Sequence, residues 1–176
     1  MRRFYLAEGF LDVVVDPPRY TFHRQDSNVD VVIPIHEGQQ YFFGSVSFNG
    51  HTIYDAETLR GEMLYLLQRP YTDARIADIP RRLQAYYKAR GYYDVKVVAI
   101  GAPEEAVNGR VPVQITIAAG PVYHFDGVTV SGLSRLHPSY VIKRFTRLNG
   151  KTYSPDVLDE RFRTLMRTGL FNVLQI

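Results

Sequence analysis

The most constraining feature of this 176-residue chain is that it repeats itself at a nearly constant step. Residues 4–13 resemble residues 86–95, and Gly9 and Gly91 in these segments are 82 positions apart. The same step aligns further positions without an insertion: Gly38 with Gly120, Tyr41 with Tyr123, Phe43 with Phe125, Val46 with Val128, Gly50 with Gly132, and Tyr71 with Tyr153. A third copy, residues 165–173, has Gly169 in the place of Gly91, 78 positions later. This step is four residues short of 82, about one helical turn, which a helix can absorb while keeping its buried face. The repeat predicts tandem copies of one small module.

One copy contains the pattern of a strand followed by two helices. Residues 41–48 are rich in aromatic and β-branched side chains and end at a turn signal, so they predict a strand. Residues 55–68 have apolar residues at helical spacing, with Asp55 as the N-cap and Pro70 after the end. Thr72 is the expected cap of a second helix, in which Pro80 produces a bend or marks the true start. The apolar stripe of that second helix consists of Ile76, Ile79, Leu83, Tyr86 and Tyr87.

Two further strands complete the module. Residues 92–100 and 111–117 alternate between apolar and polar side chains, which predicts an antiparallel hairpin with a loop longer than two residues. Pro112 and Pro34 fall in the last strands of their copies, and we expect them at strand ends because proline cannot donate to a ladder. The module therefore has the order β-α-α-β-β. Short linkers at Gly38 and Gly120 predict restricted orientations between neighbours.

Composition excludes several other classes of protein. The chain has no cysteine, so it has no disulfide framework, thiol nucleophile or cysteine-bound zinc. A net charge of +3 with scattered arginines does not indicate a nucleic-acid partner. No apolar run approaches the ~20 residues of a membrane-spanning helix, and Glu8, Gly9 and Asp12 interrupt any signal-peptide core after the basic start.

The repeated order of elements, with Tyr86-Tyr87 before Gly91-Tyr92 and Asp94-Val95 after it, resembles the POTRA domain. The aromatic and glycine positions of residues 43–50 agree with its first strand, and the resemblance covers almost the whole chain. It implies an α+β fold of tandem modules, each a three-stranded sheet covered by two helices. POTRA domains form the periplasmic arms of outer-membrane assembly barrels of the BamA and TamA type and of two-partner secretion transporters.

The positions of the repeat boundaries divide the sequence into three predicted parts. Residues 1–38 are the C-terminal part of one module, with strands at about 10–24 and 29–36. Residues 39–120 are a complete module, and residues 121–176 are the N-terminal part of another that stops inside its second strand. We therefore expect the sequence to be an excerpt from a longer array. The resemblance implies that the rest carries more modules and a membrane β-barrel, the chain's only link to the membrane.

The resemblance implies a protein-binding role without catalysis or cofactor. Unfolded outer-membrane proteins or periplasmic accessory proteins would add a strand to an open sheet edge on the periplasmic face of the outer membrane. The candidate edge carried over from the family is the second strand of the complete module: Tyr92, Tyr93, Asp94, Val95, Lys96, Val97, Val98, Ala99 and Ile100. Asp94 and Lys96 are equally well explained as charges that protect an edge from aggregation. The glycines Gly9, Gly50, Gly91, Gly132 and Gly169 are expected to be structural, those after helices as C-caps.

Other functions are weaker hypotheses. Five histidines occur without a metal-ligand spacing, and the pairs His36-Glu37 and His124 with Asp126 are common on strands, so we expect neither a metal site nor catalysis. The alternative is a small α+β RNA-binding module of the KH or RRM kind, but the chain has neither a GXXG loop nor an RNP-like strand. The two incomplete ends are complementary, so one chain could complete another by head-to-tail association.

Overall fold

The computed structural model describes residues 1–23, 25, 28–50, 53–133 and 136–170. These residues form two compact units, which are described separately: residues 1–83 with 97–117, and residues 84–96 with 118–170 of the described chain. The first unit holds most of the complete module and the part that precedes it. The predicted strand at the end of the chain, residues 171–176, lies outside the described residues.

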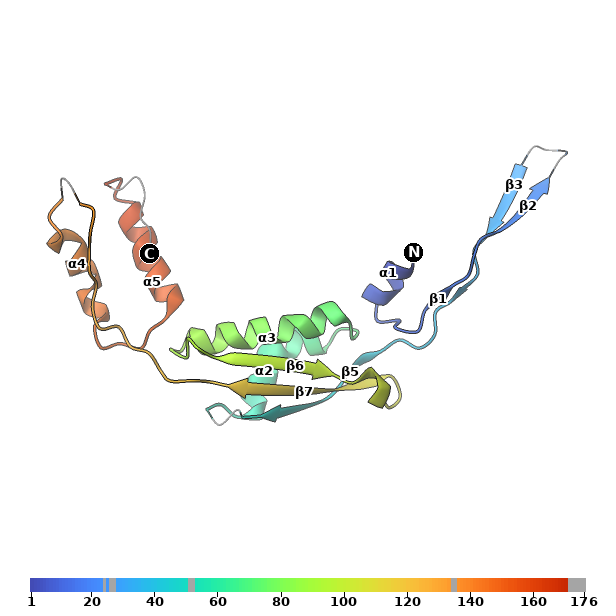
Figure 1. Cartoon of the computed structure of the whole chain (residues 1–176), viewed down its shortest axis with the longest axis horizontal. Helices are drawn as coiled ribbons and strands as arrows, with labels where there is room; N and C mark the ends of the chain where they lie inside the picture. The colour runs from blue at the N-terminus through green and yellow to red at the C-terminus, as the bar shows by residue number, and fades with distance from the viewer. Residues whose placement is uncertain (24, 26–27, 51–52, 134–135, 171–176) are drawn as a thin grey trace. The chain divides into compact units, whose positions relative to one another are not determined.

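A three-stranded sheet forms the base of the complete module (Figure 1). Its strands are β5 (Phe42–Asn49), β6 (Lys96–Gly101) and β7 (Arg110–Ala118), in the order β5-β7-β6. β7 pairs in parallel with β5, with a register irregularity between Phe43 and Val46. β6 runs opposite to β7, and the loop between them carries a short 3₁₀ helix, η1 (Pro103–Glu105). The predicted β-α-α-β-β order of elements and the hairpin with a long loop are confirmed.

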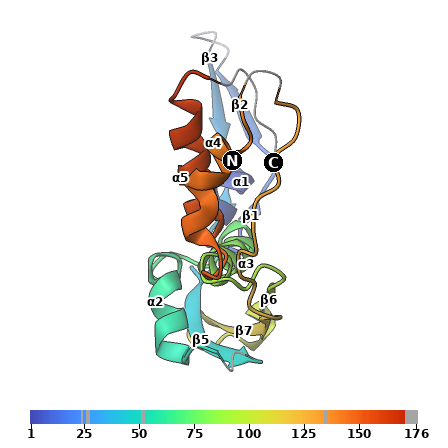
Figure 2. The same ribbon diagram turned by 90° about the vertical axis from the view of Figure 1, so that its left-hand side faces the viewer.

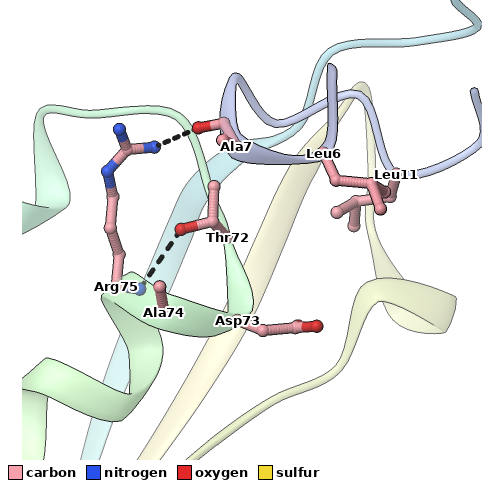
Figure 3. Close-up of a pocket in the computed structure, with 7 residues that line it drawn as sticks. All are labelled: Leu6, Ala7, Leu11, Thr72, Asp73, Ala74 and Arg75. Atoms are coloured by element: carbon pink, nitrogen blue, oxygen red, sulfur yellow. Dashed lines mark hydrogen bonds between the residues drawn. The ribbon is translucent and has the colours of Figure 1, made fainter. Parts of the chain in front are cut away.

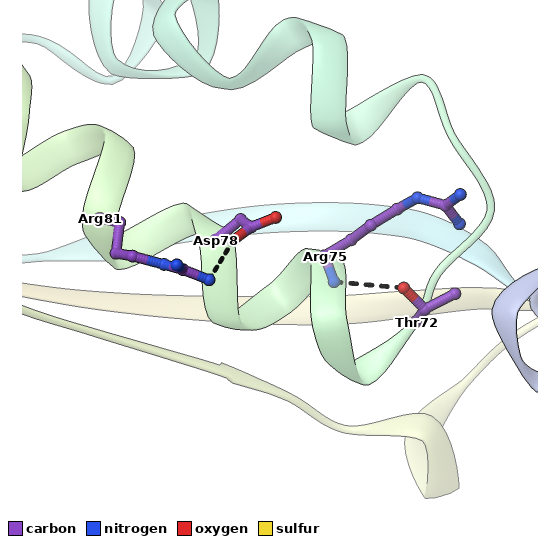
Figure 4. Close-up of polar contacts among 4 residues, drawn as sticks. All are labelled: Thr72, Arg75, Asp78 and Arg81. Atoms are coloured by element: carbon purple, nitrogen blue, oxygen red, sulfur yellow. Dashed lines mark hydrogen bonds and ion pairs between the residues drawn. The ribbon is translucent and has the colours of Figure 1, made fainter.

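Two helices, α2 (Ala56–Leu67) and α3 (Asp73–Lys88), cover one face of this sheet (Figure 2). The predicted cap of α2 is confirmed, because the Asp55 carboxylate accepts a hydrogen bond from the Thr58 amide at 2.7 Å. Thr72 caps α3 in the same way, accepting from the Arg75 amide at 3.2 Å (Figure 4). Pro80 lies inside α3, which begins at Asp73, so Pro80 does not mark the start of the helix. One turn is further tied by an ion pair of 2.5 Å between Arg81 and Asp78 (Figure 4).

The core lies between the helices and the covered face of the sheet. β7 alternates strictly between buried and less buried positions, as expected for a strand with one covered face. The helices contribute apolar residues at the spacing that the sequence predicts. The buried side chains of this layer include Phe43, Val46, Leu59, Met63, Leu66, Ile79, Leu83, Tyr87, Val97, Val111, Val113, Ile115 and Ile117.

Two expectations for the hairpin need correction or refinement. β6 begins at Lys96 and not at Tyr92, because residues 92–95 form a turn after the helix. Pro112 is the third residue of the central strand, opposite the register irregularity of β5. The Pro112 carbonyl accepts a hydrogen bond from the amide of Ala102, the residue just past the end of β6. The N–H that Pro112 lacks would therefore face β6 where its pairing with β7 ends.

The part before the complete module begins with α1 (Arg2–Ala7) and continues as a hairpin. The two long strands expected at 10–24 and 29–36 are wrong in detail, since each is interrupted. β1 (Val14–Val15) pairs with β4 (Ile35–His36), and β2 (Arg19–His23) pairs with β3 (Asn28–Val32). Prolines at 17, 18 and 34 lie at the interruption and cannot donate to a ladder.

The second unit contains the strand-equivalent segment and two helices of the following module. α4 (Ser139–Phe145) continues into η2 (Thr146–Leu148), and α5 (Pro155–Met166) follows. Their shared core consists of Val141, Phe145, Leu148 and Leu165, with Phe125, Val128 and Val130 packed against it. The strand expected at the start of this module does not form, because residues 125–131 have no ladder partner in the described part of the chain.

Candidate functional site

The open edge of the complete module is β6, because β7 occupies only one of its sides and the described residues place no strand on the other. The Ala102 amide donates to the Pro112 carbonyl at 3.1 Å, toward β7. Backbone groups of antiparallel strands alternate in direction. The amides of Val97, Ala99 and Gly101 therefore point away from β7 and toward the open edge.

The side chains of β6 divide between the two faces of the sheet. Val97 points into the core and is 6% exposed. Lys96, Val98 and Ile100 lie on the uncovered face, where Val98 is 54% and Ile100 is 60% exposed. The neighbouring positions of β7 on this face include Gln114 and Thr116, so the exposed apolar pair lies at the edge itself. This edge presents backbone donors and acceptors together with a short apolar strip.

Of the predicted site residues before Lys96, Tyr93 and Asp94 contact the following module, and Tyr92 contacts α3 of its own module. The rings of Tyr93 and Tyr153 meet edge to face with centroids 5.7 Å apart, and Tyr92 packs on Tyr87 at the same distance. Asp94 accepts a hydrogen bond from the Tyr123 hydroxyl at 2.5 Å. The structure thus places residues 92–95 in a joint between modules, and residues 96–100 on the edge strand.

The corresponding joint in the first unit has the same construction. The Tyr41 amide donates to the Gly9 carbonyl, and the Tyr71 amide donates to the Tyr41 carbonyl, both at 2.8 Å. The Tyr41 hydroxyl donates to Asp12 at 2.7 Å, which raises the pKa of this phenol above its ordinary value. These bonds connect the end of one module to the first strand and second helix of the next.

A shallow cavity of about 340 Å³ lies beside this first joint (Figure 3). Its wall is made by the end of α1 and the start of α3, and the Arg75 guanidinium donates to the Ala7 carbonyl at 3.3 Å (Figure 3). The same guanidinium donates to the Pro70 carbonyl at 2.8 Å. Through these two Nη1 hydrogen bonds, Arg75 links the end of α1 to the segment before α3.

The second joint repeats these contacts 82 positions later. The Tyr123 amide donates to Gly91 at 2.9 Å, and the Tyr153 amide donates to Tyr123 at 2.8 Å. The hydrogen bond to Asp94 raises the pKa of the Tyr123 phenol. Ring pairs also match: Phe43 with Tyr71 and Phe125 with Tyr153 both have centroids 5.2 Å apart. The sequence repeat therefore reproduces the contacts between modules as well as the elements within each module.

Gly91 shows why the joint requires glycine. It has φ of +93°, and the Tyr92 amide bonds back to the Tyr87 carbonyl, as in a Schellman helix end. A Cβ on Gly91 would lie 2.5 Å from Thr152 Cγ2 and 3.0 Å from Val122 Cγ1. The expected glycines Gly9, Gly50, Gly132 and Gly169 also have positive φ. Glycine at position 91 thus allows both the positive φ of the helix end and the close approach of the next module.

The tyrosine–aspartate bonds of the joints are the feature that sequence reasoning missed. Tyr41 and Tyr123, and Asp12 and Asp94, are each related by the repeat step. That correspondence was the available signal, but the partners are 29 residues apart and nothing local indicates that they meet.

Other chemistries find little support in the described part of the chain. No group of three or more His, Asp or Glu side chains there is arranged to hold a metal ion. His36 lies 3.5 Å from Asp16, the residue after β1, and His23 lies 2.7 Å from Asp30 across the exposed pair β2 and β3. None of the helices described is long and apolar enough to cross a bilayer.

Tandem β-α-α-β-β modules, joined through glycine helix ends and tyrosine–aspartate bonds, define a class of modular repeat protein with open sheet edges. Residues 41–120 match the POTRA family model, described as a surface antigen variable number repeat. The match covers the central module from its first strand to its last, and the residues before and after it repeat the same sequence pattern. Of the two hypotheses from the sequence, the POTRA assignment is therefore favoured over the RNA-binding fold.

Known proteins extend this similarity beyond the central module. A putative outer membrane protein assembly factor of Treponema pallidum is 24% identical over 141 residues, or 75% of this chain. The chain spans only 16% of the length of that relative. The crystal structure of Haemophilus influenzae BamA POTRA3-5 superposes with a TM-score of 0.59 at 21% identity, covering 99% of this chain and 68% of that one. CdiB from Escherichia coli matches at 15% identity and a TM-score of 0.38, covering 74% of this chain and 23% of that one.

Proposed function

We propose that this chain belongs to the periplasmic region of an outer-membrane protein assembly or translocation machine. There its modules hold unfolded outer-membrane proteins or accessory proteins by strand addition to β6. The similarity to an assembly factor and to BamA supports the setting. The observation that carries the mechanism is the open edge of β6, with outward amides at Val97, Ala99 and Gly101.

Strand addition suits a receptor for many different clients. An extended peptide pairs with the backbone of an edge strand, so the affinity does not depend on one client sequence. Its alternate side chains would lie beside Val98 and Ile100 on the uncovered face. The preferred client segment is therefore an extended strand with apolar residues at every second position. The competing explanation is that Lys96 protects the edge against any pairing.

The test removes one outward amide at Ala99, whose small side chain is only half-buried on the covered face. Ala99→Pro deletes the Ala99 N–H and places a ring at the edge, whereas Ala99→Val keeps the amide and serves as the matched control. Val97→Pro is less suitable because the Val97 side chain is buried. One lost hydrogen bond of about 1 kcal/mol weakens binding roughly fivefold. Fluorescence anisotropy with a labelled peptide of alternating apolar residues should show this loss for the proline variant only.

A second variant keeps the hypothesis testable if proline disturbs the fold. Val98→Thr with Ile100→Thr leaves all backbone groups in place and removes only the apolar strip. Weaker binding of the alternating peptide by this variant supports strand addition at β6. If neither variant changes peptide affinity, capture at this edge is wrong. Tight, salt-dependent binding of single-stranded RNA would instead favour the alternative function.

A further inference from the structure

The open edge strand β6 ends beside a buried tyrosine. Tyr71 is 2% exposed, and its ring packs on Phe43 of β5 with centroids 5.2 Å apart. The ring reaches across the covered face of the sheet to Gly101, the last residue of β6. A Cβ on Gly101 would collide with the Tyr71 hydroxyl and would lie 2.7 Å from Cε2 of the ring. Gly101 has no positive φ, so the approach of this ring, and not the backbone conformation, requires glycine here.

The Tyr71 hydroxyl has no hydrogen-bond partner among the described residues. Buried hydroxyls usually have one, because a hydroxyl that leaves water without a new partner raises the free energy of the fold. This hydroxyl lies against Gly101, whose amide points toward the open edge. A side chain of an added strand can therefore supply the partner that the described chain does not.

Two carboxylates lie near the same end of the edge. Glu104 follows Gly101 by three residues, in η1, and is exposed. Asp73 is the first residue of α3, and its side chain points away from the Arg75 guanidinium (Figure 3). Neither carboxylate forms an ion pair within the part of the chain that the structure describes. Burial raises the pKa of Tyr71, and the charges of Asp73 and Glu104 raise it further, so both carboxylates act on this phenol.

We infer that β6 selects clients with a lysine or arginine in the strand position opposite Gly101. Residues directly opposite each other in a sheet share a face, so this client side chain lies on the covered face, beside the Tyr71 hydroxyl. Its cation donates to the phenol oxygen and is balanced by Glu104 and Asp73. The neighbouring client residue, opposite Ile100, is apolar and lies on the uncovered face. This inference rests on the proposed function, because it names the chemistry of a client held at β6.

Peptides that differ at a single position test this selection. Three labelled peptides of alternating apolar and polar residues carry lysine, glutamine or glutamate at one shared polar position. Each is titrated with the full chain by fluorescence anisotropy. Lysine should bind about two- to fivefold more tightly than glutamine, and glutamate more weakly by a similar factor. Because salt screens exposed charges, these differences should shrink at high ionic strength.

Variants of the chain locate the groups responsible. Glu104→Gln should reduce the lysine preference and leave the affinity for the glutamine peptide unchanged, whereas Glu104→Lys should invert the preference. Glu57→Gln removes another exposed carboxylate, on α2, and is the matched control that should change neither. Tyr71→Phe keeps the ring beside Gly101 and removes only the hydroxyl, so it should weaken binding of the lysine peptide alone.

The outcomes separate this inference from the proposed function. Equal affinity for the three peptides, with all of them weakened by Ala99→Pro, would overturn the selection and leave strand addition at β6 standing. A lysine preference that Glu104→Gln and Tyr71→Phe both leave unchanged would also overturn the selection. If none of the peptides binds, both the selection and the proposed function are wrong.

Discussion

The hydroxyl of Tyr123 donates a hydrogen bond of 2.5 Å to Asp94, and the Tyr41 hydroxyl bonds Asp12 in the same way 82 positions earlier. In both cases an aspartate in the turn after a helix meets the first tyrosine of the next module. Because the backbone hydrogen bonds to the carbonyls of Gly9 and Gly91 repeat as well, the chain builds each joint from one pattern. We expect this pattern to limit motion between neighbouring modules.

Removing the Tyr123 hydroxyl should loosen the second joint without unfolding the module. Tyr123→Phe keeps the ring but leaves Asp94 without this donor, so amide exchange of residues 91–95 should become faster while exchange in β7 stays unchanged. Hydrogen exchange measured by NMR checks this. Tyr65→Phe, on the exposed surface of α2, is the control and should change neither region. Unchanged exchange at residues 91–95 would show that the backbone bonds alone hold the joint.

The joints should weaken in alkaline solution. The hydrogen bonds to Asp12 and Asp94 raise the pKa of Tyr41 and Tyr123 above 10.0. A phenol whose pKa is higher in the folded state binds more protons there than in the unfolded chain. The contribution of this phenol to the free energy of unfolding is therefore complete below pH 10 and is lost as pH rises through the folded pKa. Denaturant unfolding between pH 8 and pH 11, at fixed ionic strength, should show a smaller alkaline loss for the double variant Tyr41→Phe, Tyr123→Phe.

Two glycine substitutions should have opposite effects on stability. Gly91→Ala places a methyl group against Thr152 at a positive φ and should cost about 1–3 kcal/mol of unfolding free energy. Gly61→Ala lies inside α2 with open space around the new methyl group, and should add about 0.5–1 kcal/mol. Urea unfolding of both variants measures the difference. A Gly91→Ala variant as stable as the parent chain would contradict the close approach at the joint.

The N-cap of α2 predicts a loss of stability in acid. Hydrogen bonds from the amide and hydroxyl of Thr58 lower the pKa of Asp55 below 3.8. The cap is therefore fully effective above that pH and is lost as pH falls through the lower folded value. Asp55→Ser keeps a capping oxygen without titration, so its unfolding midpoint should fall less steeply between pH 5 and pH 2. Parallel acid curves for the two chains would contradict this role.

Much of the fold follows from local patterns. The caps at Asp55 and Thr72 and the alternating strand around Ile115 use only short-range information, namely helical spacing, a capping oxygen and a period of two. The sequence shows that Pro34 cannot donate a hydrogen bond inside a strand. It does not show that the hairpin is divided there into the pairs β1–β4 and β2–β3. Whether a proline ends a strand depends on which neighbour its missing N–H would have faced.

The candidate site was predictable only in part. The sequence pattern predicts an edge strand at residues 92–100, but residues 92–95 form a turn in which Tyr93 and Asp94 contact the following module. The same alternation of side chains occurs in a strand and in an extended turn, and only the partner distinguishes them. The strand-equivalent segment at Val128 illustrates the converse, since it has the sequence of a strand but no ladder in the described residues.

The sequence by itself determined the module, its order of elements and its repeat, because hydrophobic period, helix caps and glycines act over a few residues. Only the tertiary structure decided that β6 is the open edge and that Tyr123 reaches Asp94. Both depend on which distant segments become neighbours, and that choice is made by burial of the shared core rather than by any local pattern.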